Sequence, residues 1–313
     1  MRPNPASIDA TMPVRSGSAQ AWAVAVRPRT LAVALSPVLV GATFGFERTG
    51  TIDVLAALLV LGAALLMQLI TNMQNDVGYT VRGGDSSGTR TGLPRATANG
   101  WLSVRHVRTA IVLAAIVAVA LGLALASRRG WPVIAIGVSS LLAALAYMGG
   151  PRPIAYTPFG EFVVFVFFGL VAVAGSDFIQ TGNIGFSTWL ASIALGALAA
   201  AALAVNNQRD IEHDRSVGRR TFPVVFGART ARGMYAASIV GAFFLVLPIA
   251  WVDGAPTLLA PLLLLPAALR LNRDFVACPP GLAYNAILVR TFKLELGYAA
   301  LMASGAVAAR LLA

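Results

Sequence analysis

A polar stretch at residues 206–221, NNQRDIEHDRSVGRRT, follows an apolar segment that has almost no polar side chains. Asn206, Asp210 and Asp214 are spaced i, i+4 and i+8, so a helix would place them along one face. A carboxylate at the mouth of an apolar segment costs free energy unless it meets a cation or water. The cost is about 2.5–3.5 kcal/mol for an Asp at the centre of a membrane helix and less near its end. This stretch therefore predicts a cation site.

A second stretch, NMQNDVGYTVRGGD at residues 72–85, has the same construction. Asn72 and Asp76 are spaced i, i+4 at the end of another apolar segment, and Asp85 follows in a glycine-containing loop. Two acidic helix ends, each followed by a basic loop, suggest a site that holds two cations and, through them, binds a polyanion.

Magnesium is the ion that this set of residues favours. Mg²⁺ prefers hard oxygen ligands and is often held by a few carboxylates together with substrate phosphates. It can neutralise the charge that develops on a departing diphosphate. The predicted metal ligands and catalytic acids are Asp76, Asp85, Asp210 and Asp214. The alternative is that these aspartates cap helices or pair with neighbouring arginines.

Basic residues accompany both acidic stretches. The candidate ligands for phosphate or carboxylate groups are Arg82, Arg95, Arg209, Arg219 and Arg220, because a guanidinium binds such anions in a bidentate manner. Each of them could equally serve only to orient the chain in a membrane.

Two residues outside these stretches are further candidates. Glu161 opens an apolar segment, where it is either a functional acid facing a cavity or an acid favoured by the helix dipole. Tyr147 flanks the turn GGPRPIAY and lies close to the predicted polar chemistry.

The composition is that of an integral membrane protein. The chain is 57% hydrophobic and 12% charged, with a mean hydropathy of +0.74, whereas a soluble domain has about 25% charged residues. The net charge of +11 is compatible with nucleic-acid binding. Its distribution between apolar segments instead favours positive cytoplasmic loops, so we expect no nucleic-acid partner.

The predicted fold is an all-α bundle of about nine transmembrane helices capped by cytoplasmic loops. The apolar spans are roughly 22–46, 53–76, 106–127, 131–149, 159–177, 187–207, 230–252, 255–270 and 285–312. We expect residues 1–20 to be a disordered cytoplasmic tail and residues 21–313 to be a single transmembrane domain.

The basic residues predict the orientation of this bundle. With the N-terminus inside, all but four of the 24 lysines and arginines lie on the cytoplasmic side; the four are Arg48, Arg128, Arg129 and Arg310. The positive-inside rule then places both acidic stretches on the cytoplasmic face. We expect a bacterial inner-membrane protein whose active site faces the cytoplasm.

At these residues the chain resembles the UbiA superfamily of intramembrane aromatic prenyltransferases. The resemblance covers most of the chain from about residue 25. It is carried, besides the two acidic stretches, by RPRTL at 27–31, GLPRAT at 92–97 and GGPRPIAYTPFGEFVVFVFFGLVAV at 149–173. The last segment resembles the branch that acts on 1,4-dihydroxy-2-naphthoate in the menaquinone pathway.

The resemblance implies a bundle around a cavity that opens to lipid, and an Mg²⁺-dependent enzyme. A polyprenyl diphosphate would ionise, and the allylic cation would alkylate an aromatic acid, with loss of its carboxylate in this branch. The resemblance also implies diphosphate and Mg²⁺ ligands at Asn72, Asp76, Asp85, Asn206, Asp210 and Asp214, and phosphate contacts from Arg82, Arg95 and Arg209.

Two positions depart from the family pattern. Tyr79 stands where the family usually has a further aspartate, and Arg219 stands where it usually has lysine. Tyr79 shares a helix face with Asp76 at i, i+3, so its phenol could donate a hydrogen bond to a diphosphate oxygen instead of binding metal.

Three other functions remain open from the sequence. The same fold could use another acceptor, such as 4-hydroxybenzoate, or cyclise a terpene without any acceptor. A transporter of anions would also place charges along a membrane pathway, usually near its midplane. Here the acids gather at one face, which favours an interfacial enzyme.

Overall fold

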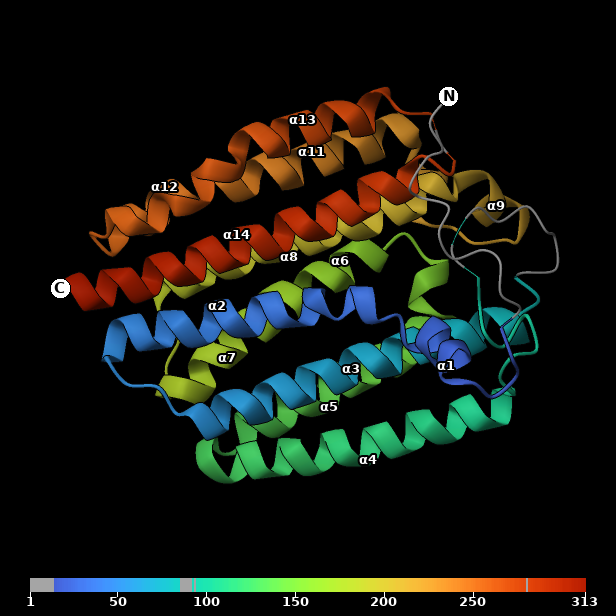
Figure 1. Ribbon diagram of the computed structural model, residues 1–313, viewed down its shortest axis with the longest axis horizontal. Coiled ribbons are helices and arrows are strands. Elements are labelled where there is room, and N and C mark those ends of the chain that lie inside the picture. The colour runs from blue at the N-terminus through green and yellow to red at the C-terminus, as the bar shows by residue number, and fades with distance from the viewer. Residues whose placement is uncertain (1–13, 85–91, 93, 280) are drawn as a thin grey trace.

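The computed structural model describes residues 14–84, 92, 94–279 and 281–313, and this part of the chain is helical with no β-strand (Figure 1). The elements are α1 (Ala19–Val26), η2 (Pro28–Thr30), α2 (Ala32–Thr49), α3 (Val54–Val81), α4 (Val104–Arg129), α5 (Trp131–Met148), η3 (Ile154–Tyr156), α6 (Gly160–Val164), the π-helix η4 (Phe165–Val171), α7 (Ala172–Thr181), α8 (Phe186–Arg209), α9 (Ile211–Ser216), α10 (Phe222–Phe226), α11 (Ala228–Phe244), α12 (Val246–Val252), η5 (Pro256–Leu264), α13 (Leu265–Ala277) and α14 (Tyr284–Leu312).

The long helices run lengthwise as a bundle, which confirms the predicted all-α membrane fold (Figure 1). Within the described residues, six helical segments are long and apolar enough to cross a membrane: α3, α4, α5, α6 to α7, α8, and α11 to α12. They coincide with six of the nine predicted spans. The remaining three spans correspond to α2, to η5 with α13, and to α14, and their crossing stays a prediction.

The first predicted span is not one continuous helix. It breaks after Val26, where Arg27 adopts a left-handed conformation (φ 55°) and Pro28 starts a short 3₁₀ turn. The Asn72 side chain donates to the Val26 carbonyl (2.7 Å) and to Thr30 Oγ1 (2.9 Å). The break therefore allows the α1–α2 connection to dock on α3 beside the first acidic stretch.

Helix α8 lies at the centre of the bundle. In an 18-residue apolar stretch of α8, 72% of the residues are buried. The figure is 17% for the corresponding stretches of α3, α4 and α5, which turn most of their surface outward. Small residues make this position possible, because a Cβ on Gly169 of η4 would lie 2.5 Å from the Gly196 Cα of α8. Close packing against η4 and α11 thus fixes α8, and the second acidic stretch follows at the C-terminal end of this helix.

The two ends of the bundle differ in composition. α9 and α1 lie at one end, and the C-terminus lies at the other (Figure 1). At the C-terminal end, Arg48 pairs with Asp177 (2.6 Å) and Arg128 pairs with Asp53 at the start of α3. Arg129 donates to the carbonyl of Ile179 (2.8 Å). This end therefore holds the arginines that the sequence assigned to the outer face.

The beginning of the predicted N-terminal tail falls outside the described residues. Within residues 14–20, the Gly17 amide donates to the Trp101 carbonyl (2.8 Å), and α1 begins at Ala19 with Ser18 as its N-cap.

Candidate active site

Asp76 is completely buried near the end of α3 and holds a loop in place. Its two carboxylate oxygens accept the backbone amides of Ala96 (2.9 Å) and Thr97 (2.8 Å), and the Thr97 hydroxyl donates to it as well. A buried carboxylate needs such donors because it has lost its hydration. In this arrangement Asp76 positions the GLPRAT segment, and with it Arg95.

Tyr79 joins the two acidic stretches. Its hydroxyl accepts a hydrogen bond from Arg219, whose Nη1 also donates to Asp214 Oδ1 (2.6 Å). The Arg95 guanidinium carbon lies 3.7 Å from the centroid of the Tyr79 ring, a cation–π contact. The residue that departs from the family pattern in each stretch is therefore the residue that touches the other stretch.

Arg219 is buried between α9 and α10 and keeps its charge. Its Nε and Nη2 donate to the Ala155 carbonyl (3.1 and 3.0 Å). Burial lowers the pKa of Arg219 to about 9, so the side chain remains a cation at neutral pH. Its partner Asp214 is fully buried and also accepts from Thr221 (3.2 Å). Arg219 is therefore a buried cation between the two acidic stretches, and Asp214 balances its charge.

Asp210 lies at the turn that ends α8, so the predicted single helix through Asp214 is interrupted at this residue. The i→i+4 backbone bonds nevertheless continue from Asp210 N to Asn206 O (3.2 Å) and from Asp214 N to Asp210 O (2.7 Å). Arg209 donates two hydrogen bonds to the Asp210 carboxylate, from Nε to Oδ1 (2.8 Å) and from Nη2 to Oδ2 (2.6 Å). Its Nη1 donates to Asn285 Oδ1 of α14 (2.7 Å).

Arg82 holds the loop that follows α5. It donates to the carbonyls of Met148 (2.7 Å) and Gly150, and its guanidinium carbon lies 5.8 Å from the Tyr156 ring centroid. It therefore connects the first acidic stretch to the GGPRPIAY turn.

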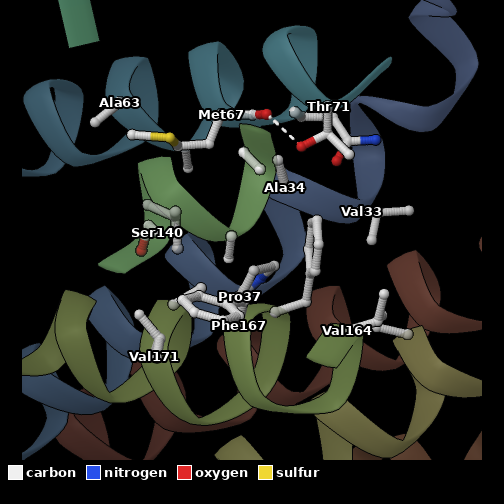
Figure 2. A pocket seen from close by; sticks show the side chains of 18 of the residues that line it. Val33, Ala34, Pro37, Ala63, Met67, Thr71, Ser140, Val164, Phe167 and Val171 are labelled. Carbon is white, nitrogen blue, oxygen red and sulfur yellow. Dashed lines mark hydrogen bonds between the residues drawn. The ribbon is translucent and has the colours of Figure 1, made fainter. Parts of the chain in front are cut away.

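An apolar cavity of about 310 Å³ lies among α2, α3, α5, η4 and α8 (Figure 2). Pro37, Met67, Phe167 and Val171 are among the side chains that line it. Along α3 the lining runs from Val60 to Asn75, about 22 Å at the rise of an α-helix. The cavity therefore has the length for an extended apolar chain.

One end of this cavity is polar. Asn72, Asn75 and Asn206 line it there, together with Arg27 and Tyr147. Asn75 precedes Asp76, and Asn206 lies one helical turn before Asp210, so the apolar cavity ends at the two acidic stretches.

Glu161 is buried at the start of α6 but does not line this cavity. Its Oε1 accepts from Asn207 Nδ2 (2.8 Å), and its Oε2 has no hydrogen-bond partner among the described residues. The Asn207 contact was missed from the sequence, as were the Thr97 and Asn285 contacts. Only Thr97 had a signal, because it belongs to the GLPRAT segment.

The oxygen donors of the site fit magnesium chemically. Asp85 lies outside the described residues, and within them no three acidic, histidine or cysteine side chains converge as a metal cage. Mg²⁺ commonly uses one or two carboxylates plus substrate phosphates and water, so it needs no such cage. Asp210 and Asp214 are paired with arginines, which are themselves phosphate ligands.

Comparisons with known proteins show the family to which the chain belongs. Residues 34–280 match the UbiA prenyltransferase family. The chain is 34% identical over 228 residues to 1,4-dihydroxy-2-naphthoate octaprenyltransferase of Escherichia coli (strain K12), covering 71% of this chain and 73% of that protein. It is 30% identical over 267 residues to the protein of the same name in Bacillus subtilis (strain 168), covering 85% of each.

Solved structures share the fold. A UbiA homolog from Archaeoglobus fulgidus bound to GPP and Mg²⁺ superposes with a TM-score of 0.68 at 18% identity, covering 93% of this chain and 99% of that chain. The apo structure of a UbiA homolog from Aeropyrum pernix K1 gives 0.67 at 18% identity, covering 89% and 97%.

Proposed function

The chain belongs to the UbiA prenyltransferase family, and from this membership we propose the reaction that its site performs. The protein is an Mg²⁺-dependent membrane enzyme that transfers a polyprenyl group from a polyprenyl diphosphate to an aromatic acid, 1,4-dihydroxy-2-naphthoate, in menaquinone biosynthesis. One observation carries the assignment on this chain. An apolar cavity long enough for an extended chain ends at two facing stretches of carboxylates and guanidinium groups.

The site residues divide between the diphosphate and the chain. Asp76, Asp85, Asp210 and Asp214 would hold Mg²⁺, with the amides of Asn72 and Asn206 beside them. When bound, Mg²⁺ neutralises charge on the departing diphosphate. Arg82, Arg95 and Arg209 would contact phosphate oxygens. The isoprenoid chain would occupy the apolar cavity, where Phe167 lies in the lining and would help to exclude water from the chain.

Two buried arginines could bind the incoming diphosphate. Arg209 and Arg219 are both buried and paired with carboxylates. The same guanidinium groups can bind a diphosphate in addition to their carboxylate partners. Each buried arginine then has an anionic partner both before and after the substrate binds. Tyr79 would donate its hydroxyl hydrogen to the diphosphate, since a phenol can donate one hydrogen bond while it accepts another, here from Arg219.

The decisive assay uses the purified protein in lipid nanodiscs with Mg²⁺, a series of polyprenyl diphosphates and a panel of aromatic acids. We expect diphosphate release together with a prenylated, decarboxylated naphthalenediol identified by mass, and loss of both on chelation of Mg²⁺. Preference for 4-hydroxybenzoate would change the acceptor, and a cyclic product formed without acceptor would indicate a terpene cyclase. Binding and translocation of anions with no diphosphate release would contradict an enzyme.

We also propose that the site faces the cytoplasm of a bacterial inner membrane. The distribution of basic residues supports this orientation. In a background without Cys278, a cysteine at the exposed Ser216 of α9 should react with an impermeant thiol reagent only in inverted vesicles. The matched control is a cysteine at the exposed Thr51, beyond the far end of α2, which should react only in right-side-out vesicles. The opposite labelling pattern would reverse the orientation.

A further inference from the structure

A second hollow lies on the flank of the bundle, away from the cavity of the active site. It has a volume of about 940 Å³, and six phenylalanines line it: Phe159, Phe162, Phe165, Phe222, Phe226 and Phe244. α8 forms its floor, and α6 with η4 and α11 form its walls. We call this hollow the α6–α11 groove.

The groove and the cavity lie on different sides of the pair formed by α8 and the α6–η4 segment. Ala199 and Ala202 of α8 line the cavity, whereas Ala197 and Ala200 line the groove. The groove opens to the membrane flank, because Phe159, Phe162 and Phe244 are more than 60% exposed. A ligand could therefore enter it sideways from lipid.

The groove carries one unsatisfied polar atom. Glu161 lines it, is 3% exposed, and has a carboxylate oxygen, Oε2, with no hydrogen-bond partner among the described residues. Its other oxygen is fixed by Asn207 (2.8 Å). A buried polar atom without a partner costs free energy, and a ligand that donates a hydrogen bond would remove that cost.

The groove has no cation to bind the anionic substrates of the proposed reaction. Its lining includes Glu161 but no lysine or arginine, so nothing there would balance the charge of a diphosphate or a naphthoate carboxylate. The active-site cavity, by contrast, has Arg27 in its lining, together with Asn206, which lies one helical turn before the pair of Arg209 and Asp210. The groove suits a neutral molecule with a hydroxyl donor and a long apolar tail.

We propose that the α6–α11 groove binds the prenylated naphthalenediol product. The product's phenolic hydroxyl donates to Glu161 Oε2, and its isoprenoid chain lies over the phenylalanines. This rests on the proposed function, in which transfer removes the diphosphate and the carboxylate and leaves a neutral phenol on an apolar chain. A phospholipid shares the apolar tail, but its phosphate would lie against a carboxylate with no cation to balance it.

A ligand–protein double-mutant cycle tests the hydroxyl contact. The probes are a geranylated 1,4-naphthalenediol, kept reduced, and its 1,4-dimethoxy derivative, which has no hydroxyl donor. Their affinities are measured by titration into nanodiscs holding wild-type protein or Glu161→Met. We expect the diol to bind wild type about 10-fold more tightly than the dimethoxy probe, and this difference to vanish in Glu161→Met. Equal affinities for wild type, or an unchanged difference in the variant, would overturn the contact.

Blocking the groove provides a second measurement that does not depend on Glu161. Ala237→Trp fills the wall formed by α11, and Ala120→Trp on the exposed face of α4 is the matched control. With a photoreactive group on the geranyl tail of the diol, crosslinks should map by mass to the peptide containing Phe159 and Phe162. They should fall at least 10-fold in Ala237→Trp and stay unchanged in Ala120→Trp.

Three results would contradict the proposal. These are crosslinks confined to the cavity lining, equal crosslinking in the two tryptophan variants, or displacement of the probe by short-chain phosphatidylglycerol as efficiently as by unlabelled diol. None of these measurements needs turnover. A protein that binds the diol here but transfers no prenyl group would refute the proposed function and leave the groove site standing.

Discussion

Buried aspartates bind arginines at both ends of the bundle, but the surroundings of the two pairs differ. At the end where the C-terminus lies, Asp177 accepts from Arg48 (2.6 Å), the Thr188 hydroxyl (2.6 Å) and the Gly185 amide (3.0 Å). Thr181 also donates to it (3.3 Å). At the other end, Asp210 accepts two hydrogen bonds from its neighbour Arg209, one helical turn beyond Asn206, which lines the polar end of the cavity.

The comparison separates a structural aspartate from a candidate catalytic one. Besides Arg48, Asp177 receives donors fixed by the backbone and by short hydroxyl side chains, so it ties α2, α7 and α8 together. Arg209 is an ion partner of Asp210 that can also bind a phosphate, so this ion pair is compatible with binding of an anionic substrate. A buried Asp–Arg pair is therefore not by itself a sign of catalysis. The adjoining cavity and the kind of donor distinguish the two ends.

Asp76 is intermediate between these two cases. Its oxygens accept fixed donors from Ala96 and Thr97, as those of Asp177 do from Gly185 and Thr188. Asp76 nevertheless follows Asn75, which lines the cavity. We infer that Asp76 orders the loop carrying Arg95 in addition to its proposed metal role.

The strongest test of the comparison is Asp210→Asn. The substitution keeps the shape but removes a charge that the proposed Mg²⁺–diphosphate complex needs. We expect kcat to fall at least about 100-fold, the scale of losing one preorganised electrostatic contact in a transition state. Turnover is measured in nanodiscs at saturating Mg²⁺, with the thermal unfolding midpoint as the control for folding. Activity within a few-fold of wild type would remove Asp210 from the metal site.

Asp177→Asn should lower the stability of the protein and leave kcat unchanged, the reverse of what we expect for Asp210→Asn. The change leaves Arg48 facing a neutral amide at a site where the carboxyl is fully buried. Breaking a buried pair costs about 3–5 kcal/mol, and we expect about 2–4 here because Arg48 is one-third exposed. Thermal unfolding in detergent should show the loss, while kcat per folded molecule stays near wild type. A large fall in kcat with unchanged stability would show that the two ends are not functionally distinct.

Much of this comparison could be predicted from local sequence, because the relevant signals are local. Apolar segments predicted the helices, and the i, i+4 spacing placed Asn206 and Asp210 together at the end of α8. The distribution of arginines separated Arg48 and Arg128 from the acidic stretches, and the structure places both at the other end of α3.

The partners of the acidic residues could not be predicted in the same way. The link between Tyr79 and Arg219 joins residues 140 positions apart, and the pair of Glu161 and Asn207 spans 46. Such contacts depend on how α3, α6 and α8 pack and not on the sequence near each residue. The break at Arg27 was also missed, although Pro28 and two arginines interrupt the apolar pattern there.

The smallest predicted effect concerns Tyr79, the residue through which the two acidic stretches meet. Tyr79→Phe keeps the ring beneath Arg95 but removes the hydroxyl that accepts from Arg219. A hydrogen bond to a charged group contributes about 1.5–3 kcal/mol, so we expect kcat/KM to fall about 10- to 150-fold. The rate should be measured over a range of Mg²⁺ concentrations, since a phenol that binds phosphate leaves the Mg²⁺ dependence unchanged when it is lost.

Tyr79→Asp then distinguishes a phosphate-binding phenol from a missing metal ligand. It restores the carboxylate usual in the family, so we expect half-maximal activity at a lower Mg²⁺ concentration than in wild type. It also removes the ring that Arg95 stacks on and gives Arg219 a second carboxylate partner, so the maximal rate should fall even as Mg²⁺ affinity rises. A variant with wild-type Mg²⁺ dependence, together with a silent Tyr79→Phe, would exclude Tyr79 from the site. Its contact with Arg219 would then be structural, as the contacts of Asp177 are at the other end of the bundle.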